Sequence, residues 1–112
     1  MPRSKFNNIK TVVYGIKFDS KGESSRYIVL RDRQKIGLIA NLTTQVAYPL
    51  IVNGVKIARY VADFVYDQNG VTIVEDYKST STAKLPVFRL KLKLMKACHG
   101  VTIKCVYTAT EQ

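Results

Sequence analysis

Hydrophobic residues fill most of two consecutive runs in the middle of the chain, residues 60–68 and 71–78. Asn69-Gly70 separates the runs, and both of its positions tolerate a positive φ, which favours the tight turn of a β-hairpin. The pattern therefore predicts two antiparallel strands joined at this dipeptide. A second pair, Asn53-Gly54, predicts another turn just before the first of these strands.

The N-terminal third predicts a β-rich segment followed by a helix. Residues 11–18 are rich in residues that favour strands. Ser20 and Glu23 have the spacing of a capping box, in which the serine side chain accepts from the N–H of the third helical residue. We therefore expect a helix over residues 21–35, ended by Gly37.

The C-terminal third predicts a second helix. The polar segment 79–82 is suited to cap a helix that runs from about Ala83 to His99. Pro86 is tolerated only in the first turn of a helix, so a start nearer Leu85 is the alternative.

Two further segments complete the expected sheet. Residues 38–52 are expected to form one or two strands. Pro49 has no N–H to donate, so its region is expected at a sheet edge or a strand end. Residues 101–107 alternate as a last strand. The chain is therefore expected to be an α/β protein of the α+β kind with a mixed sheet.

The length and charge of the chain limit what the protein can be. Its 112 residues make one domain, 1–112, with a basic arm at 1–10 and a tail at 108–112. Lys and Arg number 18 against 8 Asp and Glu, giving a net charge of +10, while 46% hydrophobic content indicates a folded protein. A compact domain this cationic usually binds a polyanion, and nucleic acid is the first candidate.

Membrane insertion and secretion are not expected from the sequence. No apolar run approaches the ~20 residues that a membrane span needs. The first residues lack the apolar core of a signal peptide. We therefore expect a cytoplasmic protein.

The hairpin carries charged residues where a hydrophobic strand does not need them. Side chains alternate along a strand, so Asp76 and Lys78 point to one face and Glu75 and Tyr77 to the other. The partner strand can bring Asp63 alongside the first pair. The result is two carboxylates and an ammonium at one site.

Such a cluster suits metal-dependent phosphodiester hydrolysis. Mg²⁺ usually takes one or two carboxylates together with water and substrate phosphate, and it lowers the pKa of a bound water. Lys78 can hold that water or stabilise the pentavalent phosphate. The structural alternative is a salt bridge between Asp76 and Lys78 at the strand end, with Asp63 exposed on an edge. An Asp-x-Lys triplet alone is weak evidence for choosing the metal site over the salt bridge.

Glu23 has two possible roles. As a capping-box member it needs no function. However, it shares a helical face with Tyr27 and Leu30, the face expected to lie on the sheet. A carboxylate at the start of that helix could reach Asp63 and Asp76.

Several basic residues are candidates for phosphate contacts, with solvated surface positions as the alternative. They lie on the two predicted helices and in the N-terminal arm. The helical positions are Arg26, Arg31, Arg33, Arg89, Lys93 and Lys96, and those of the arm are Arg3 and Lys5.

Other chemistries find little support. His99 is the only histidine, so a serine or cysteine hydrolase is not expected, and a helix-end role is favoured for it. Cys98 and Cys105 are too few for a zinc site, and we expect both to be reduced core residues.

The order of these motifs resembles the PD-(D/E)xK nuclease superfamily, and within it the small phage nucleases that include the junction-resolving endonucleases of T-odd phages. The resemblance covers about residues 16–98. It is carried by Phe18-x-Ser20-x-x-Glu23, Gly37-x-Ile39, Gln45 with Tyr48-Pro49, Tyr60-x-x-Asp63-Phe64, Asn69-Gly70 and Asp76-x-Lys78.

The resemblance implies a restriction-endonuclease-like αβββαβ core and a role for each site residue. Asp63 and Asp76 would be ligands of Mg²⁺ or Mn²⁺, Glu23 an additional acid, and Lys78 the catalytic lysine. It further implies a phage enzyme that works in the bacterial host cell as a homodimer on branched DNA, such as a Holliday junction or a flap.

Three positions qualify the resemblance. Ala62 stands where the superfamily's name expects proline, and Asp76 stands where glutamate is commoner, which shortens that side chain by one methylene. Gln45 resembles a glutamine found near the site in some relatives, and a buried polar strand residue is equally compatible.

Two functional classes follow. The first is a Mg²⁺-dependent DNA endonuclease. The second is a non-catalytic, basic DNA-binding module that keeps a nuclease-like fold. The basic surface suits both, and the set of Glu23, Asp63, Asp76 and Lys78 favours the first.

Overall fold

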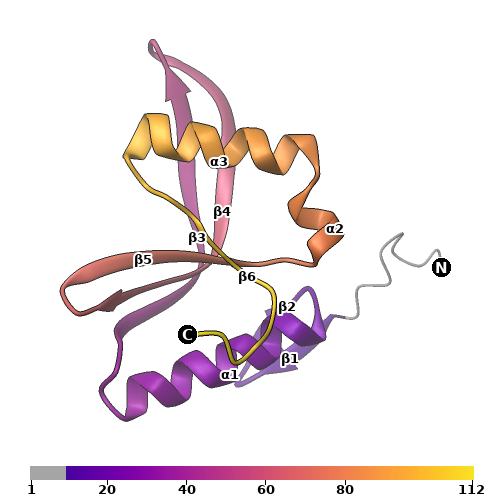
Figure 1. Ribbon diagram of the computed structural model, residues 1–112, viewed down its shortest axis with the longest axis vertical. Coiled ribbons are helices and arrows are strands. Elements are labelled where there is room, and N and C mark those ends of the chain that lie inside the picture. Colours follow the sequence, from indigo (N-terminus) through magenta and orange to yellow (C-terminus); the bar gives the residue numbers. More distant parts are fainter. Residues whose placement is uncertain (1–9) are drawn as a thin grey trace.

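The computed structural model describes residues 10–112 (Figure 1). Its elements follow in the order β1 (Thr11–Val13), β2 (Ile16–Phe18), α1 (Lys21–Lys35), β3 (Ala40–Val52), β4 (Val55–Gln68), β5 (Val71–Tyr77), α2 (Thr80–Ala83), α3 (Pro86–His99) and β6 (Lys104–Val106). Most of the predicted basic arm, including Arg3 and Lys5, lies outside the described residues.

The central sheet has four strands in the order β3-β4-β5-β6. β3, β4 and β5 pair antiparallel, whereas β6 pairs parallel to β5. The sheet is therefore mixed, and α1, β3, β4, β5, α3 and β6 follow one another in the predicted αβββαβ order. β1 and β2 form a separate small hairpin.

The two Asn-Gly turns are where the sequence predicts them. Asn53 and Gly54 have φ values of 50° and 79°, and Asn69 and Gly70 have φ values of 52° and 77°. Positive φ at both central positions is what a type I′ hairpin turn requires. These turns set the pairing of β3 with β4 and of β4 with β5. As Pro49 indicated, β3 is an edge strand.

The first helix is confirmed at both ends. α1 spans Lys21–Lys35, and the Ser20 hydroxyl accepts from the N–H of Glu23 at 3.1 Å. Gly37 follows the helix with a φ of 83°.

The C-terminal third differs from the prediction in two places. The helix expected from Ala83 is two helices, because Ser79 caps a separate turn and accepts from the N–H of Thr82. Leu85 is then extended, as a residue before proline prefers, so α3 begins at Pro86, in agreement with the alternative start near Leu85. The last strand is shorter than expected, since only Lys104–Val106 pair with β5.

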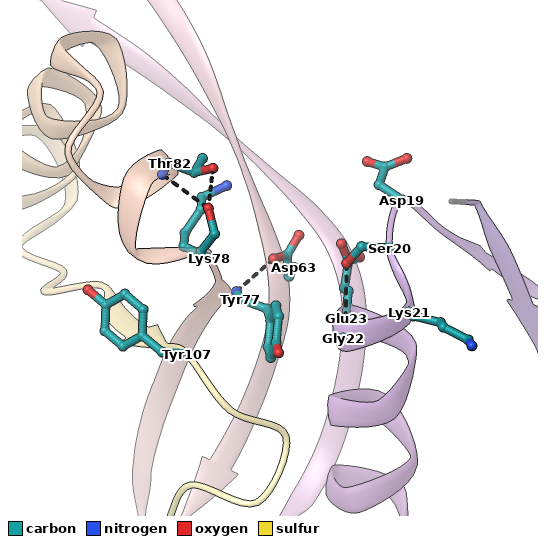
Figure 2. A pocket seen from close by; sticks show the side chains of 11 residues that line it. Asp19, Ser20, Lys21, Gly22, Glu23, Asp63, Tyr77, Lys78, Thr82 and Tyr107 are labelled. Atoms are coloured by element: carbon teal, nitrogen blue, oxygen red, sulfur yellow. Dashed lines mark hydrogen bonds between the residues drawn. The ribbon is translucent and has the colours of Figure 1, made fainter. Parts of the chain in front are cut away.

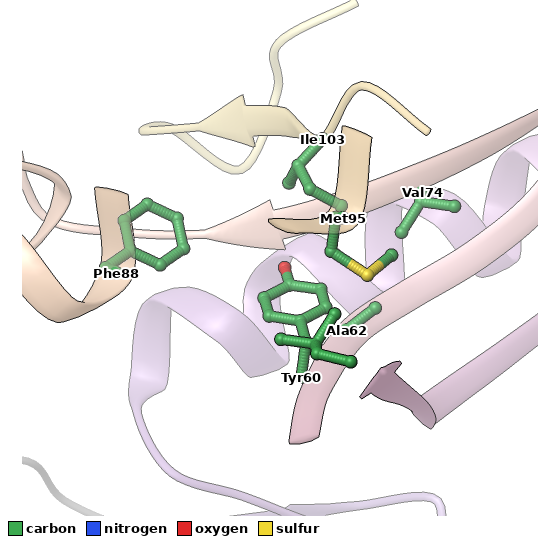
Figure 3. Close-up of a cluster of buried hydrophobic side chains, with 7 residues drawn as sticks. Tyr60, Ala62, Val74, Phe88, Met95 and Ile103 are labelled. Carbon is green, nitrogen blue, oxygen red and sulfur yellow. The ribbon is translucent and has the colours of Figure 1, made fainter. Parts of the chain in front are cut away.

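Two hydrophobic clusters form the core, and β4 contributes to both. Tyr60 and Ala62 pack with Phe88 and Met95 of α3 (Figure 3), while Phe64 and Tyr66 pack with Leu30 of α1. These four β4 residues would share one face of a regular strand, so the alternation of faces is interrupted between the two pairs. Asp63 lies at that interruption. In Figure 1, α3 crosses one half of the β3–β4 hairpin and α1 lies at its other end.

Within residues 10–112, none of the helices combines the length and apolar character needed to cross a lipid bilayer.

Candidate functional site

Two consecutive acids near the end of β5 are both buried, and they point to opposite faces of the sheet. Glu75 faces α1. Its carboxylate accepts from Arg26 Nε at 2.6 Å and Nη2 at 2.9 Å, and from the Tyr66 hydroxyl at 2.6 Å. Both oxygens of Glu75 therefore have partners, and this carboxylate is part of the packing.

Asp76 is different. Its Oδ2 accepts from the Tyr60 hydroxyl at 2.7 Å and lies 3.4 Å from Lys78 Nζ. Its Oδ1 is buried and accepts from no nitrogen or hydroxyl donor, and the neighbouring Asp63 carboxyl can bond Asp76 only while one of the two acids holds a proton. A buried carboxylate oxygen left unpaired costs free energy and requires an explanation.

Asp63 on the neighbouring strand is also buried. Its Oδ2 accepts from the backbone N–H of Tyr77 at 2.8 Å. Burial, then a side-chain hydrogen bond with Asp76, and then the charges of Asp76 and Glu23 raise the pKa of Asp63 to about 9. The structural alternative of an exposed Asp63 on a sheet edge is therefore wrong, because β4 is an inner strand.

Glu23 faces the same acidic region from the start of α1. Burial raises its pKa to about 7, with further contributions from Asp19 and Asp76. Its Oε1 accepts from Gln45 Nε2 at 3.1 Å. The capping-box serine is in place, and the glutamate side chain contacts β3, so Glu23 joins helix and sheet.

Gln45 belongs to this group through its bond to Glu23. It lies opposite Asp63, since the pairs on either side are Thr44 with Phe64 and Val46 with Ala62. Its φ of 54° is unusual for a strand residue other than glycine. Gln45 is exposed, so its interpretation as a buried polar strand residue is wrong.

Lys78 lines two separate cavities. We call the first the acidic cleft (Figure 2). It has a volume of about 530 Å³, and Glu23 faces Asp63 across it. It is lined by Asp19, Ser20, Lys21, Gly22, Glu23, Asp63, Tyr77, Lys78, Ser79, Thr82 and Tyr107.

We call the second cavity the basic pocket. It has a volume of about 430 Å³ and lies between β4 and the start of α3. It is lined by Arg59, Tyr60, Val61, Asp76, Lys78, Leu85, Val87, Phe88 and Lys91. Asp76 thus opens toward the basic pocket, whereas Glu23 and Asp63 open toward the acidic cleft.

The three acids do not form a ready-made metal cage. Across residues 10–112, no group of three or more His, Cys, Asp or Glu side chains is arranged to hold a metal ion. Their charges are nevertheless close enough to interact, since Asp76 raises the pKa of both Glu23 and Asp63. The structure therefore brings the acids into one region but divides them between two cavities.

The predicted cationic positions fall into two groups. Arg26 is wholly buried, so its assignment as a phosphate contact is wrong; its guanidinium pairs with Glu75 and donates to the carbonyls of Ala109 and Glu111. Arg33 also bonds this C-terminal segment, at Glu111 O.

The other cationic positions remain accessible. Arg31 lies over the Tyr14 ring at 3.6 Å. Arg89, Lys93 and Lys96 are exposed on α3. Their role as phosphate contacts stays a prediction.

Sequence reasoning missed four residues around the site. Tyr60 holds Asp76 through its hydroxyl, and the Tyr77 backbone holds Asp63. Arg59 and Lys91 line the basic pocket. A signal existed for Lys91, because it lies one helical turn after Phe88 and therefore on the face of α3 that meets the sheet.

His99 and the cysteines take structural places. His99 Nε2 lies 2.7 Å from the carbonyl oxygen of Pro49. Cys98 and Cys105 are both free and partly buried, in agreement with the expectation of reduced cysteines.

Comparison with known proteins gives a family but no functional precedent. No curated protein and no solved structure matches the chain. The sequence model described as a protein of unknown function, DUF1064, matches residues 3–109, which is nearly the whole chain. The protein therefore belongs to the DUF1064 family.

Proposed function

We propose that this protein is a DNA endonuclease that hydrolyses phosphodiester bonds with Mg²⁺ or Mn²⁺. The observation that carries the proposal is the unpaired, buried Oδ1 of Asp76 beside a second buried carboxylate, Asp63. Burying two acids together is costly, and a bound cation would remove that cost. A net charge of +10 supports a polyanionic substrate.

The donor set fits a hard divalent ion. Mg²⁺ is usually held by one or two carboxylates together with waters and substrate phosphate, so the lack of a three-acid cluster is no obstacle. Asp63 and Asp76 would hold the ion, and Glu23 would contribute from the acidic cleft. When bound, such an ion neutralises phosphate charge and lowers the pKa of a bound water.

Lys78 is the proposed catalytic lysine. Its ammonium lies 3.4 Å from Asp76 Oδ2 and 4.9 Å from the centre of the Phe88 ring, and its side chain is partly exposed. These two contacts hold the amine between the cavities. From there it can donate a hydrogen bond to the attacking water or to a nonbridging phosphate oxygen.

The finer parts of the proposal depend on the resemblance to PD-(D/E)xK nucleases. By that resemblance, the protein is a phage enzyme that cuts branched DNA as a homodimer inside the bacterial host. The αβββαβ order and the sequence of motifs support this version.

A second candidate is a DNA-binding module without catalysis. The Asp76–Lys78 ion pair favours it, because the pair partly satisfies the two charges without any ligand. This candidate leaves Asp76 Oδ1 unexplained, so we prefer the nuclease.

Cleavage of four DNA forms tests the proposal. A four-way junction, a flap, a linear duplex and single-stranded DNA should be incubated side by side with the protein in Mg²⁺ or in EDTA. We expect Mg²⁺-dependent cutting, strongest on the branched forms. Binding without cutting of any form in Mg²⁺ or Mn²⁺ would favour the non-catalytic module and reject the nuclease.

A further inference from the structure

The two cavities beside Lys78 differ in charge. The acidic cleft carries three acids, Asp19, Glu23 and Asp63, against two lysines. The basic pocket carries Arg59, Lys78 and Lys91 against Asp76 alone. Although the whole chain is strongly basic, an anion therefore meets a favourable charge in the basic pocket and an unfavourable one in the acidic cleft.

The backbone of α3 adds a second feature that favours an anion. The helix starts at the basic pocket, and its N-cap, Leu85, supplies no side-chain hydrogen bond. Pro86 has no N–H, so the first free donors are the N–H groups of Val87 and Phe88. Uncapped N–H groups and the positive end of the helix dipole both favour a phosphate.

The side chains of the pocket are also available. Among residues 10–112, neither Arg59 nor Lys91 takes part in an ion pair. Leu85 and Val87 are exposed to 42% and 66%, which leaves an apolar surface next to these cations. A sugar attached to a phosphate has the matching distribution of polarity, because its phosphate is charged and its sugar is less polar.

Asp76 links this pocket to the candidate chemistry. It is 1% exposed, lines the basic pocket and has the unpaired Oδ1. Asp76 also interacts with Asp63 of the acidic cleft, so it connects the two cavities. A strand held in the pocket would therefore reach the reacting centre directly.

We propose that the basic pocket binds a backbone phosphate of the DNA strand next to the one that is cut, through Arg59, Lys91 and the first N–H groups of α3. This inference deepens the proposed nuclease function and rests on it. The strand would enter over the basic pocket and pass Lys78. The cation would lie between the two cavities, at Asp63 and Asp76, and the attacking water would come from the acidic cleft.

The test measures binding of a labelled flap DNA without divalent ions, so that it does not depend on cleavage. Lys91→Ala and Arg59→Ala should each weaken binding about tenfold, the effect of one charged hydrogen bond. Each should also reduce the slope of log affinity against log salt by about 1. Lys91→Arg should restore most of the affinity.

Lys56→Ala is the matched control, because Lys56 is an exposed cation on the same strand as Arg59, lines neither cavity and is not among the predicted phosphate contacts. It should change affinity clearly less than Lys91→Ala. Thermal melting of each variant checks that the fold is intact. Competition with inorganic phosphate tells whether the pocket prefers a phosphate of the DNA backbone or free phosphate. Millimolar phosphate should displace the DNA only weakly.

The outcomes separate this inference from the proposed function. Equal losses for Lys91→Ala and Lys56→Ala would overturn the pocket even if the wild-type protein cuts DNA. Tight binding of free phosphate with no preference for DNA would overturn it as well. A selective loss at Lys91 in a protein that never cuts DNA would keep the pocket as a phosphate site and reject the nuclease.

Discussion

Glu75 and Asp76 are neighbours in sequence and equally buried, yet they differ in what surrounds them. On the α1 face, Arg26 and Tyr66 satisfy both oxygens of Glu75. On the α3 face, Asp76 keeps one buried oxygen without a donor group as its partner. It also raises the pKa of the neighbouring Glu23 and Asp63 carboxyl groups. A buried acid with complete partners contributes to the fold, whereas an incomplete one marks a place for a ligand.

The largest expected effect is on the Glu75 side. Glu75→Gln leaves the buried Arg26 charge without its counter-ion, and breaking a buried pair in this way costs about 3–5 kcal/mol. Chemical denaturation should show a correspondingly lower free energy of unfolding. Asp32→Asn, at an exposed acid on the same helix as Arg26, is the control and should change it little. A loss of stability in Glu75→Gln as small as that in Asp32→Asn would mean that Glu75 is not the structural acid that the comparison with Asp76 requires.

The second prediction concerns the metal. Mg²⁺ or Mn²⁺ would bind the folded site and not the unfolded chain. A free ion concentration of about a hundred times the dissociation constant should therefore stabilise the protein by about 2.7 kcal/mol. This corresponds to a rise in melting temperature on the order of 10 °C. Asp63→Asn should abolish the rise in melting temperature. Glu75→Gln should show the same rise, starting from a lower melting temperature without the ion. A rise that survives in Asp63→Asn would place the ion elsewhere.

The third prediction concerns pH without divalent ions. The raised pKa values of about 7 for Glu23 and about 9 for Asp63 mean that the folded state holds protons which the unfolded state has lost. Their contribution to stability is complete below about pH 4 and disappears as pH rises through 7 and 9. Stability should fall by up to about 1.4 kcal/mol per pH unit for each proton. Denaturation midpoints at pH 5, 7 and 9 would show it, and a flatter profile is expected for Asp63→Asn.

The smallest predicted effect distinguishes the two neighbours most clearly. Asp76→Asn should leave the stability of the metal-free protein equal or higher, within about 1 kcal/mol. The amide oxygen can still accept from Tyr60, and the lost ion pair with the partly exposed Lys78 is worth about 0–1 kcal/mol. Removal of repulsion toward Glu23 and Asp63 offsets that loss. A drop as large as that of Glu75→Gln would make Asp76 a structural residue too.

Most of the fold could be predicted because its signals are local. Asn53-Gly54 and Asn69-Gly70 define two hairpins through their own backbone preferences, and Ser20 defines the start of α1. The start of α3 near Leu85 was anticipated from Pro86, whereas the separate helix α2 was not predicted, for an equally local reason. Ser79 caps a turn of its own before Pro86 forces the chain to extend and start again.

The site was only partly predictable, because its remaining features depend on contacts distant in sequence. The grouping of Asp63, Asp76 and Lys78 follows from strand alternation and a turn. Arg26, by contrast, looks like a surface cation on a helix, and only the packing of α1 on β5 shows that it pairs with Glu75. The change of face along β4 at Asp63 also cannot be seen in a strand pattern, which is why the division between two cavities could not be predicted.

The most direct test compares DNA cleavage by the two neighbouring variants in Mg²⁺. Asp76→Asn should lose cleavage by about 10²–10³-fold or more, the scale of losing one transition-state contact, while its fold stays intact. Glu75→Gln, measured well below its melting temperature, should still cut. An Asp76→Asn protein that cuts at the wild-type rate would contradict the assignment of this site as a nuclease centre.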